Sequence, residues 1–160
     1  MIFVEIFLIA IFTIPNLFSI KPYVVTSGSM EPKYPVGSLI YVKPIEIEEL
    51  KKDDAITFYM ANTKIVATHA IYDVNEEEKS FVTYGINNKD EDGNIIKDVN
   101  PVSYDDVIGT PILCIPYLGY INRYITSSPG IYVVIGITAL MIGMSFLIDY
   151  IKKEEVGKDE

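Results

Sequence analysis

The stretch Lys64-Ile65-Val66-Ala67-Thr68-His69-Ala70-Ile71 holds the single histidine of the chain, and apolar and polar residues roughly alternate along it. This two-residue period is typical of a β-strand with one buried face. Other runs rich in Val, Ile, Thr, Tyr and Phe recur on both sides, separated by turn signals such as Asp92-Gly93-Asn94. Short strands with close turns favour antiparallel β-structure. We predict strands at residues 23–26, 38–43, 55–60, 64–74, 80–84 and 106–116, and one helical turn within residues 45–52.

Two apolar segments flank this β-rich region. Residues 1–20 are apolar except for Glu5, and a helix of that length spans about 30 Å, the hydrocarbon thickness of a bilayer. A cleavable signal peptide would carry a basic start and a small-residue cleavage site; since neither is present, we predict a retained anchor. Residues 125–148 carry no charge, and Ser128 before Pro129 is typical of a helix start, which predicts a second transmembrane helix.

The predicted organisation is a transmembrane anchor at residues 1–20, a β domain at 21–124, a transmembrane helix at 125–150 and a charged tail at 151–160. Two spans place both termini on one side of the membrane. The basic residues Lys152 and Lys153 favour a cytoplasmic tail by the positive-inside tendency.

Composition excludes several classes of function. The net charge of −9 argues against a nucleic-acid partner, which would need a basic face. The one cysteine, Cys114, lies among apolar residues and is predicted to be a buried, inert thiol. With a single histidine and a single cysteine, a zinc site is disfavoured, and we predict no metal and no cofactor.

The stretch Val25-Thr26-Ser27-Gly28-Ser29-Met30-Glu31-Pro32 displays two hydroxyl groups soon after the first apolar run. By itself, Ser-Gly-Ser is also common in plain turns. A serine hydroxyl becomes a good nucleophile only with a base within hydrogen-bond reach and a group that orients the base. His69 is the one candidate histidine, and residues 85–93 are predicted to form an acidic loop after it.

In these segments the chain resembles signal peptidase I of the archaeal and endoplasmic-reticulum type. Ser-Gly-Ser-Met-Glu-Pro at 27–32 matches the nucleophile box of that family, and Thr-His-Ala-Ile at 68–71 matches its histidine box, where the bacterial type carries a lysine. Gly-Ile-Asn-Asn at 85–88 matches its carboxylate box. Weaker matches at 36–42, 53–58 and 115–119 extend the resemblance over roughly residues 20 to 120.

The resemblance implies a mostly β catalytic domain of antiparallel sheets, with N-terminal and C-terminal transmembrane helices. It implies Ser29 as the nucleophile, His69 as the general base and Ser27 as a second oxyanion donor beside the Ser29 N–H. The family spacing places the catalytic acid on Asp92 and a supporting acid on Ile86, which is apolar here. A shift of one or two residues in the loop would substitute Asp90 or Glu91.

The implied function is a membrane-bound serine endopeptidase that cleaves signal peptides from exported preproteins. Substrate would bind extended beside a strand edge, and the domain would face away from the cytoplasm. The expected partners are the preproteins and the lipid bilayer. The sequence does not identify other membrane subunits. One alternative is a self-cleaving repressor-type protease, against which the two membrane spans and His69 argue. The other is a non-catalytic membrane-anchored β domain that binds exported peptides, which the loss of an acid at Ile86 would suit.

Overall fold

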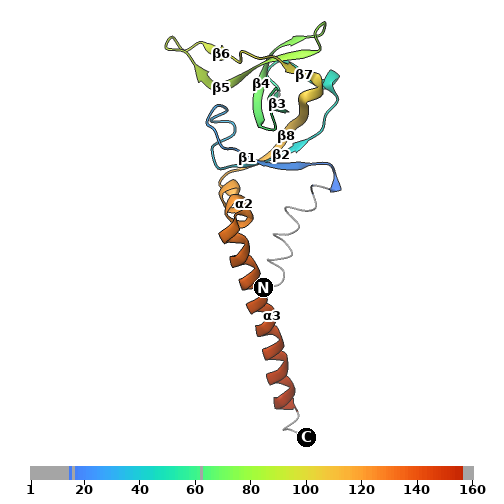
Figure 1. Ribbon diagram of the computed structural model, residues 1–160, viewed down its shortest axis with the longest axis vertical. Coiled ribbons are helices and arrows are strands. Elements are labelled where there is room, and N and C mark those ends of the chain that lie inside the picture. The colour runs from blue at the N-terminus through green and yellow to red at the C-terminus, as the bar shows by residue number, and fades with distance from the viewer. Residues whose placement is uncertain (1–14, 16, 62, 157–160) are drawn as a thin grey trace. The chain divides into compact units, whose positions relative to one another are not determined.

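The computed structural model describes residues 15, 17–61 and 63–156. The chain divides into two compact units, Met1–Tyr120 and Ile121–Glu160. The first unit contains every strand of the described residues (Figure 1). These strands are β1 (Lys21–Val24), β2 (Leu39–Lys43), β3 (Ala55–Tyr59), β4 (Val66–Asn75), β5 (Ser80–Lys89), β6 (Ile95–Lys97), β7 (Val102–Ser103) and β8 (Val107–Ile115), with single 3₁₀ turns at Ile47–Glu49 and Tyr104–Asp106.

The strands form an antiparallel sheet in the order β1-β2-β8-β3-β4-β5-β6, and β7 pairs with β5. The prediction of antiparallel β-structure is therefore confirmed, as is the helical turn expected within residues 45–52. Two short strands, β6 and β7, were not expected. The predicted acidic loop at 85–93 is wrong in its first half, because β5 continues through Gly85 to Lys89.

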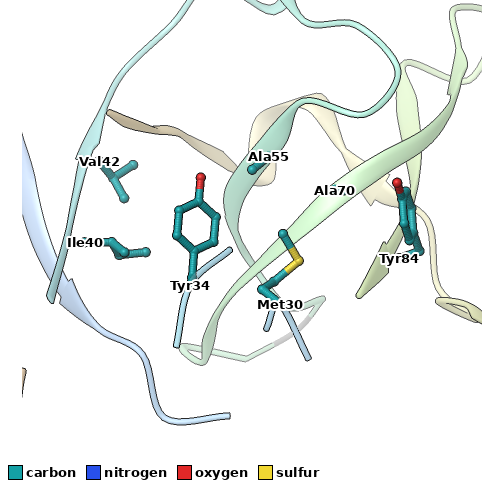
Figure 2. Close-up of a cluster of buried hydrophobic side chains, with 7 residues drawn as sticks. All are labelled: Met30, Tyr34, Ile40, Val42, Ala55, Ala70 and Tyr84. Carbon is teal, nitrogen blue, oxygen red and sulfur yellow. The ribbon is translucent and has the colours of Figure 1, made fainter. Parts of the chain in front are cut away.

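Both faces of the central strands are buried. Neighbouring side chains of a strand point to opposite faces, so Ala55 and Ile56 on β3 enter different hydrophobic clusters. One cluster, shown in Figure 2, contains Met30, Tyr34, Ile40, Val42, Ala55, Ala70 and Tyr84. The other contains Leu50, Ile56, Phe58, Ile71, Phe81 and Val102. Cys114 packs against the first cluster but is only half-buried, so the predicted buried thiol is partly accessible.

Gly109 allows β8 to pair with two different strands. β8 pairs with β2 through its second half and with β3 through its first, and the β3 register shifts beside Gly109. The φ of Gly109 is 151°, and a Cβ added there would lie 2.1 Å from the carbonyl oxygen of Lys43. Only glycine fits this close approach of two backbones.

The second unit is helical. α2 (Leu118–Thr126) crosses the boundary between the units, and α3 (Ser128–Val156) follows it. Within α3, Ser128–Ile148 is long and apolar enough to cross a membrane, with a mean hydropathy of 2.4. The predicted C-terminal apolar helix is therefore present, although it starts at Ser128 and extends into the expected tail. Most of the N-terminal anchor predicted at 1–20 lies outside the described residues.

We expect Gly109→Ala to lower the free energy of unfolding by about 2 kcal/mol or more, because the methyl group must displace the Lys43 backbone. Gly93→Ala is the matched control. Gly93 also has a positive φ, 85°, but nothing lies within 4 Å of an added Cβ, so only a backbone cost of about 1–2 kcal/mol remains. Thermal unfolding of both variants in detergent measures the difference. Equal losses would contradict the steric argument.

Candidate active site

The loop after β1 carries Ser29, which is half-buried. The next residue, Met30, is 2% exposed and anchors this loop in the first hydrophobic cluster (Figure 2). Met30 thereby fixes the position of the serine that precedes it. The Oγ of Ser29 lies 3.1 Å from the Nε2 of His69, although 40 residues separate the two in the chain.

His69 lies on β4 at the point where the sheet opens. On one side it pairs with Ile56 of β3, whereas the β4–β5 register begins only at the next residue, Ala70↔Tyr84. The rings of Phe58 and His69 form a T-shaped pair, with centroids 6.4 Å apart. The His69 side chain is 16% exposed, so it is shielded by the sheet yet open toward Ser29.

The carboxylate that meets His69 belongs to Asp98, which sequence reasoning missed. Its Oδ2 lies 2.5 Å from the Nδ1 of His69. The same oxygen accepts a hydrogen bond of 2.6 Å from the hydroxyl of Thr83, which is fully buried. The backbone N–H of Asp98 donates to the Thr83 carbonyl. Thr83 thus holds both the side chain and the backbone of Asp98.

Burial alone would raise the pKa of the Asp98 carboxyl. Hydrogen bonds from His69 and Thr83, together with the nearby imidazole charge, outweigh that cost and lower its pKa below the ordinary value. Asp98 is therefore ionised at neutral pH and can accept a hydrogen bond from the Nδ1–H of His69.

The structure does not bring Asp92, the sequence-predicted acid, into this contact. Asp92 is exposed in the turn between β5 and β6, and its N–H donates to Asp90. Asp90 organises that turn, because its carboxylate also accepts from the backbone and side chain of Asn94. The hydrogen bond from the Asn94 side chain is the main cause that lowers the Asp90 pKa. Glu91 lies in the same exposed turn.

A hairpin explains why Asp98, and not Asp92, meets His69, and spacing along the chain does not show this hairpin. β6 returns antiparallel along β5, with Tyr84↔Lys97 in register, and delivers residue 98 beside Thr83. The signal that could have found Asp98 is Asp92-Gly93-Asn94 followed by Ile95-Ile96-Lys97. A turn residue pair and a short apolar run are typical of a hairpin with a returning strand.

The Gly-Ile-Asn-Asn segment of β5 supports the serine loop and does not supply an acid. The Asn87 N–H donates to the Ser29 carbonyl at 2.8 Å, and the Asn87 side-chain amide donates to the Gly28 carbonyl at 3.1 Å. At Gly85 a Cβ would lie 2.8 Å from the same Ser29 carbonyl. Ile86, at the predicted position of a supporting acid, packs against the first hydrophobic cluster.

A groove of about 610 Å³ opens over these residues. One wall is formed by residues 23–27 of β1 and the following loop, and another by residue 65 and the first residues of β4, 66–69. Ser29, His69, Thr83 and Asp98 all line it, as does Ser27, whose Oγ lies 3.3 Å from the Oγ of Ser29. The predicted Ser27, Ser29 and His69 are thus brought together.

This arrangement has the parts of a serine nucleophile system. When Nδ1 carries the proton toward Asp98, Nε2 presents its lone pair to the hydroxyl of Ser29. His69 and Asp98 are mostly shielded from water, whereas Ser29 borders an open groove. Such a site can carry out acyl transfer on an extended chain laid in the groove.

Comparison with known proteins gives several significant relatives, although no protein-family model matches the chain. Signal peptidase I W of Bacillus subtilis is 40% identical over 89 residues, which cover 54% of this chain and 46% of the relative. The human signal peptidase complex catalytic subunit SEC11C is 27% identical over 110 residues, 66% of this chain and 57% of the relative. SEC11 of Colletotrichum graminicola is 27% identical over 125 residues, which cover 74% of this chain and 72% of the relative.

The chain therefore spans about half the length of the first two relatives. All three names denote signal peptidases, from a bacterium, a mammal and a fungus. These names agree with the family that the sequence resembles. The chain is thus similar to a bacterial signal peptidase I and to the catalytic subunits of signal peptidase complexes.

Proposed function

We propose that this protein is a membrane-bound serine endopeptidase that removes signal peptides from exported preproteins. The observation that carries the proposal is the continuous chain of contacts from Ser29 through His69 to Asp98 beside an open groove. The names of the relatives supply the substrate class.

In the proposed reaction His69 accepts the proton of the Ser29 hydroxyl while Oγ attacks the scissile carbonyl carbon. The imidazolium then delivers this proton to the leaving amine, which leaves an acyl ester on Ser29. A water molecule, deprotonated by the same imidazole, hydrolyses the ester. Asp98 stays ionised, keeps Nδ1 protonated and stabilises the positive ring.

Two groups are proposed to stabilise the oxyanion of the tetrahedral intermediate. The first is the backbone N–H of Ser29, which belongs to the attacking residue. The second is the Ser27 hydroxyl, which lies 3.3 Å from the nucleophilic oxygen and so borders the place where the charge develops.

The substrate is proposed to bind as an extended strand in the groove. β1 is the outer strand of its side of the sheet, paired with β2. The first residues of β4 pair with β3, but not with β5 within the described ladder. Both wall segments therefore offer strand edges that an extended peptide can join through main-chain hydrogen bonds. The resemblance implies small residues before the cleaved bond.

We place the protein in a membrane with two spans, α3 and the predicted anchor at 1–20, and with the β domain outside the cytoplasm. The apolar stretch Ser128–Ile148 supports the first of these spans. Membrane attachment would raise the effective concentration of enzyme and signal helix for each other. A non-catalytic, peptide-binding β domain is the alternative function.

Removing the nucleophile or the base is expected to abolish cleavage. Ser29→Ala and His69→Ala should each lower turnover of a model preprotein about 10³-fold or more, and the double variant should be little worse because the pair acts as a unit. A serine-directed covalent probe should label the wild type at Ser29 and fail on both variants. Near-wild-type cleavage by His69→Ala would sink the serine–histidine assignment, and absence of labelling would favour the non-catalytic alternative.

Asp98→Asn should lower turnover about 10²- to 10⁴-fold with little change in KM, since an amide keeps the shape but presents the wrong hydrogen-bond partner to Nδ1. Asp92→Asn is the matched control, because this acid is exposed in the hairpin turn. Its turnover should stay within about twofold of wild type. Steady-state kinetics with a preprotein substrate decide between them, and the reverse ranking would restore the sequence-based assignment to Asp92.

The topology can be tested by cysteine labelling of sealed vesicles in a Cys114→Ser background. We expect a cysteine at Asn75, at the end of β4, to react only with reagent on the extracytoplasmic side. A cysteine at Glu160 should react only from the cytoplasmic side. Reaction of both from one side would contradict the two-span arrangement.

A further inference from the structure

Behind the catalytic acid, on the opposite face of the sheet, lies a cluster of aromatic and cationic side chains. Successive residues of a strand point to opposite faces. Asp98 contacts Thr83 and His69 on one face, while its neighbour Lys97 is in register with Tyr84, the neighbour of Thr83. Lys97, the last residue of β6, therefore lies on the face of the β5–β6 pair opposite to the face on which Asp98 meets Thr83.

Lys97 is held there by an aromatic ring. Its Nζ lies 3.9 Å from the centroid of Tyr72, which is a close cation–π contact. Tyr72 meets the ring of Tyr84 edge-on, with centroids 6.0 Å apart. The Tyr84 hydroxyl donates to Asp53 at 2.9 Å. The Tyr72 ring that Lys97 contacts is thus held against β5, and through Tyr84 it is linked to the turn before β3.

Apart from the Thr83–Asp98 contacts after it and the Asp90–Asn94 turn before it, β6 has little else to hold it in place. It is three residues long and every one of them is exposed, so burial contributes little to its position. Its register with β5 has only two pairs, Tyr84↔Lys97 and Lys89↔Ile95, with an irregularity between them. Such a short edge strand is marginal without side-chain contacts.

We propose that Lys97 is a positioning residue: its contact with Tyr72 holds β6 against β5, so that Asp98 stays on the Nδ1 of His69. The proposal rests on the proposed peptidase function for its kinetic consequence but not for its structural one. Thr83 fixes Asp98 on the face of the sheet that carries His69, and Lys97 fixes the adjoining end of β6 on the reverse face.

The structural consequence can be read without substrate, because His69 is the only histidine in the chain. In detergent-solubilised full-length protein with ¹⁵N-labelled histidine, the hydrogen-bonded Nδ1–H gives a single NMR signal. We expect Lys97→Met and Tyr72→Leu to shift or broaden this signal toward its state in Asp98→Asn. Lys97→Arg should preserve it, since a guanidinium also binds the face of an aromatic ring.

Lys52→Met is the matched control. Lys52 also lies over Tyr72, with its Nζ 5.2 Å from the centroid, but it belongs to the turn before β3 and not to β6. It should leave the Nδ1–H signal unchanged. An unchanged signal in Lys97→Met, or an equal change in Lys52→Met, would overturn the proposal whether or not the protein cleaves preproteins.

The kinetic consequence is a loss of turnover that requires Asp98. Lys97→Met should lower turnover about 2- to 5-fold, as expected for one exposed cation–π contact, with KM unchanged. In the Asp98→Asn background the same change should have less than about a 1.5-fold effect, because the residue acts through that acid. Equal losses in both backgrounds would show that Lys97 acts elsewhere. If the wild type itself cleaves nothing, the proposed function fails, while the NMR comparison still decides the role of Lys97.

Discussion

The position of β5 is the constraint on which the rest of the site depends. Asn87 near its end binds the backbone of the serine loop, and Tyr84 starts the pairing with the histidine strand. Thr83 holds the acid by both backbone and side chain. Ser29, His69 and Asp98 come from segments far apart in the chain, and each segment is located by a different residue of β5. A shift of β5 by one residue would turn Thr83 and Tyr84 to the wrong faces, and it would disturb all three contacts together.

The burial of both faces of the sheet explains why β5 can keep this register. Phe81 is fully buried in one cluster, whereas Tyr84 packs in the other. A strand buried on both sides has its register strongly specified, because slippage would expose apolar side chains on each face at once. His69 and Thr83 therefore lie on rigid strands, whereas Ser29 lies on the loop after β1 and Asp98 directly follows β6. Even that loop is anchored by Met30.

The sequence predicted the strands near the histidine well, because alternation and turn residues are local signals. It also indicated Ser27, Ser29 and His69 through the residues that resemble the family, and these three do converge. The acid could not be located in this way. Spacing along the chain selects Asp92, but a hairpin changes which residue lies opposite Thr83. The apolar Ile86 is explained by three-dimensional packing, since β5 places it against the first cluster. α2 was missed because residues 118–126 were counted partly with the β domain and partly with the membrane helix.

The contrast between Asp92 and Asp98 also shows what an orienting acid requires. A fully exposed carboxylate interacts with its surroundings through water of high dielectric constant, so its charge is strongly screened. Asp98 is 27% exposed and His69 16% exposed, so their contact is much less screened. Burial by itself would favour protonation of Asp98, which would remove the acceptor that the imidazole needs. The Thr83 hydroxyl counters this effect, because a hydrogen bond donated to a carboxylate stabilises the ionised form. A half-buried acid with such a donor can therefore stay ionised in direct contact with the imidazole, whereas an exposed acid in the hairpin turn would act only through solvent.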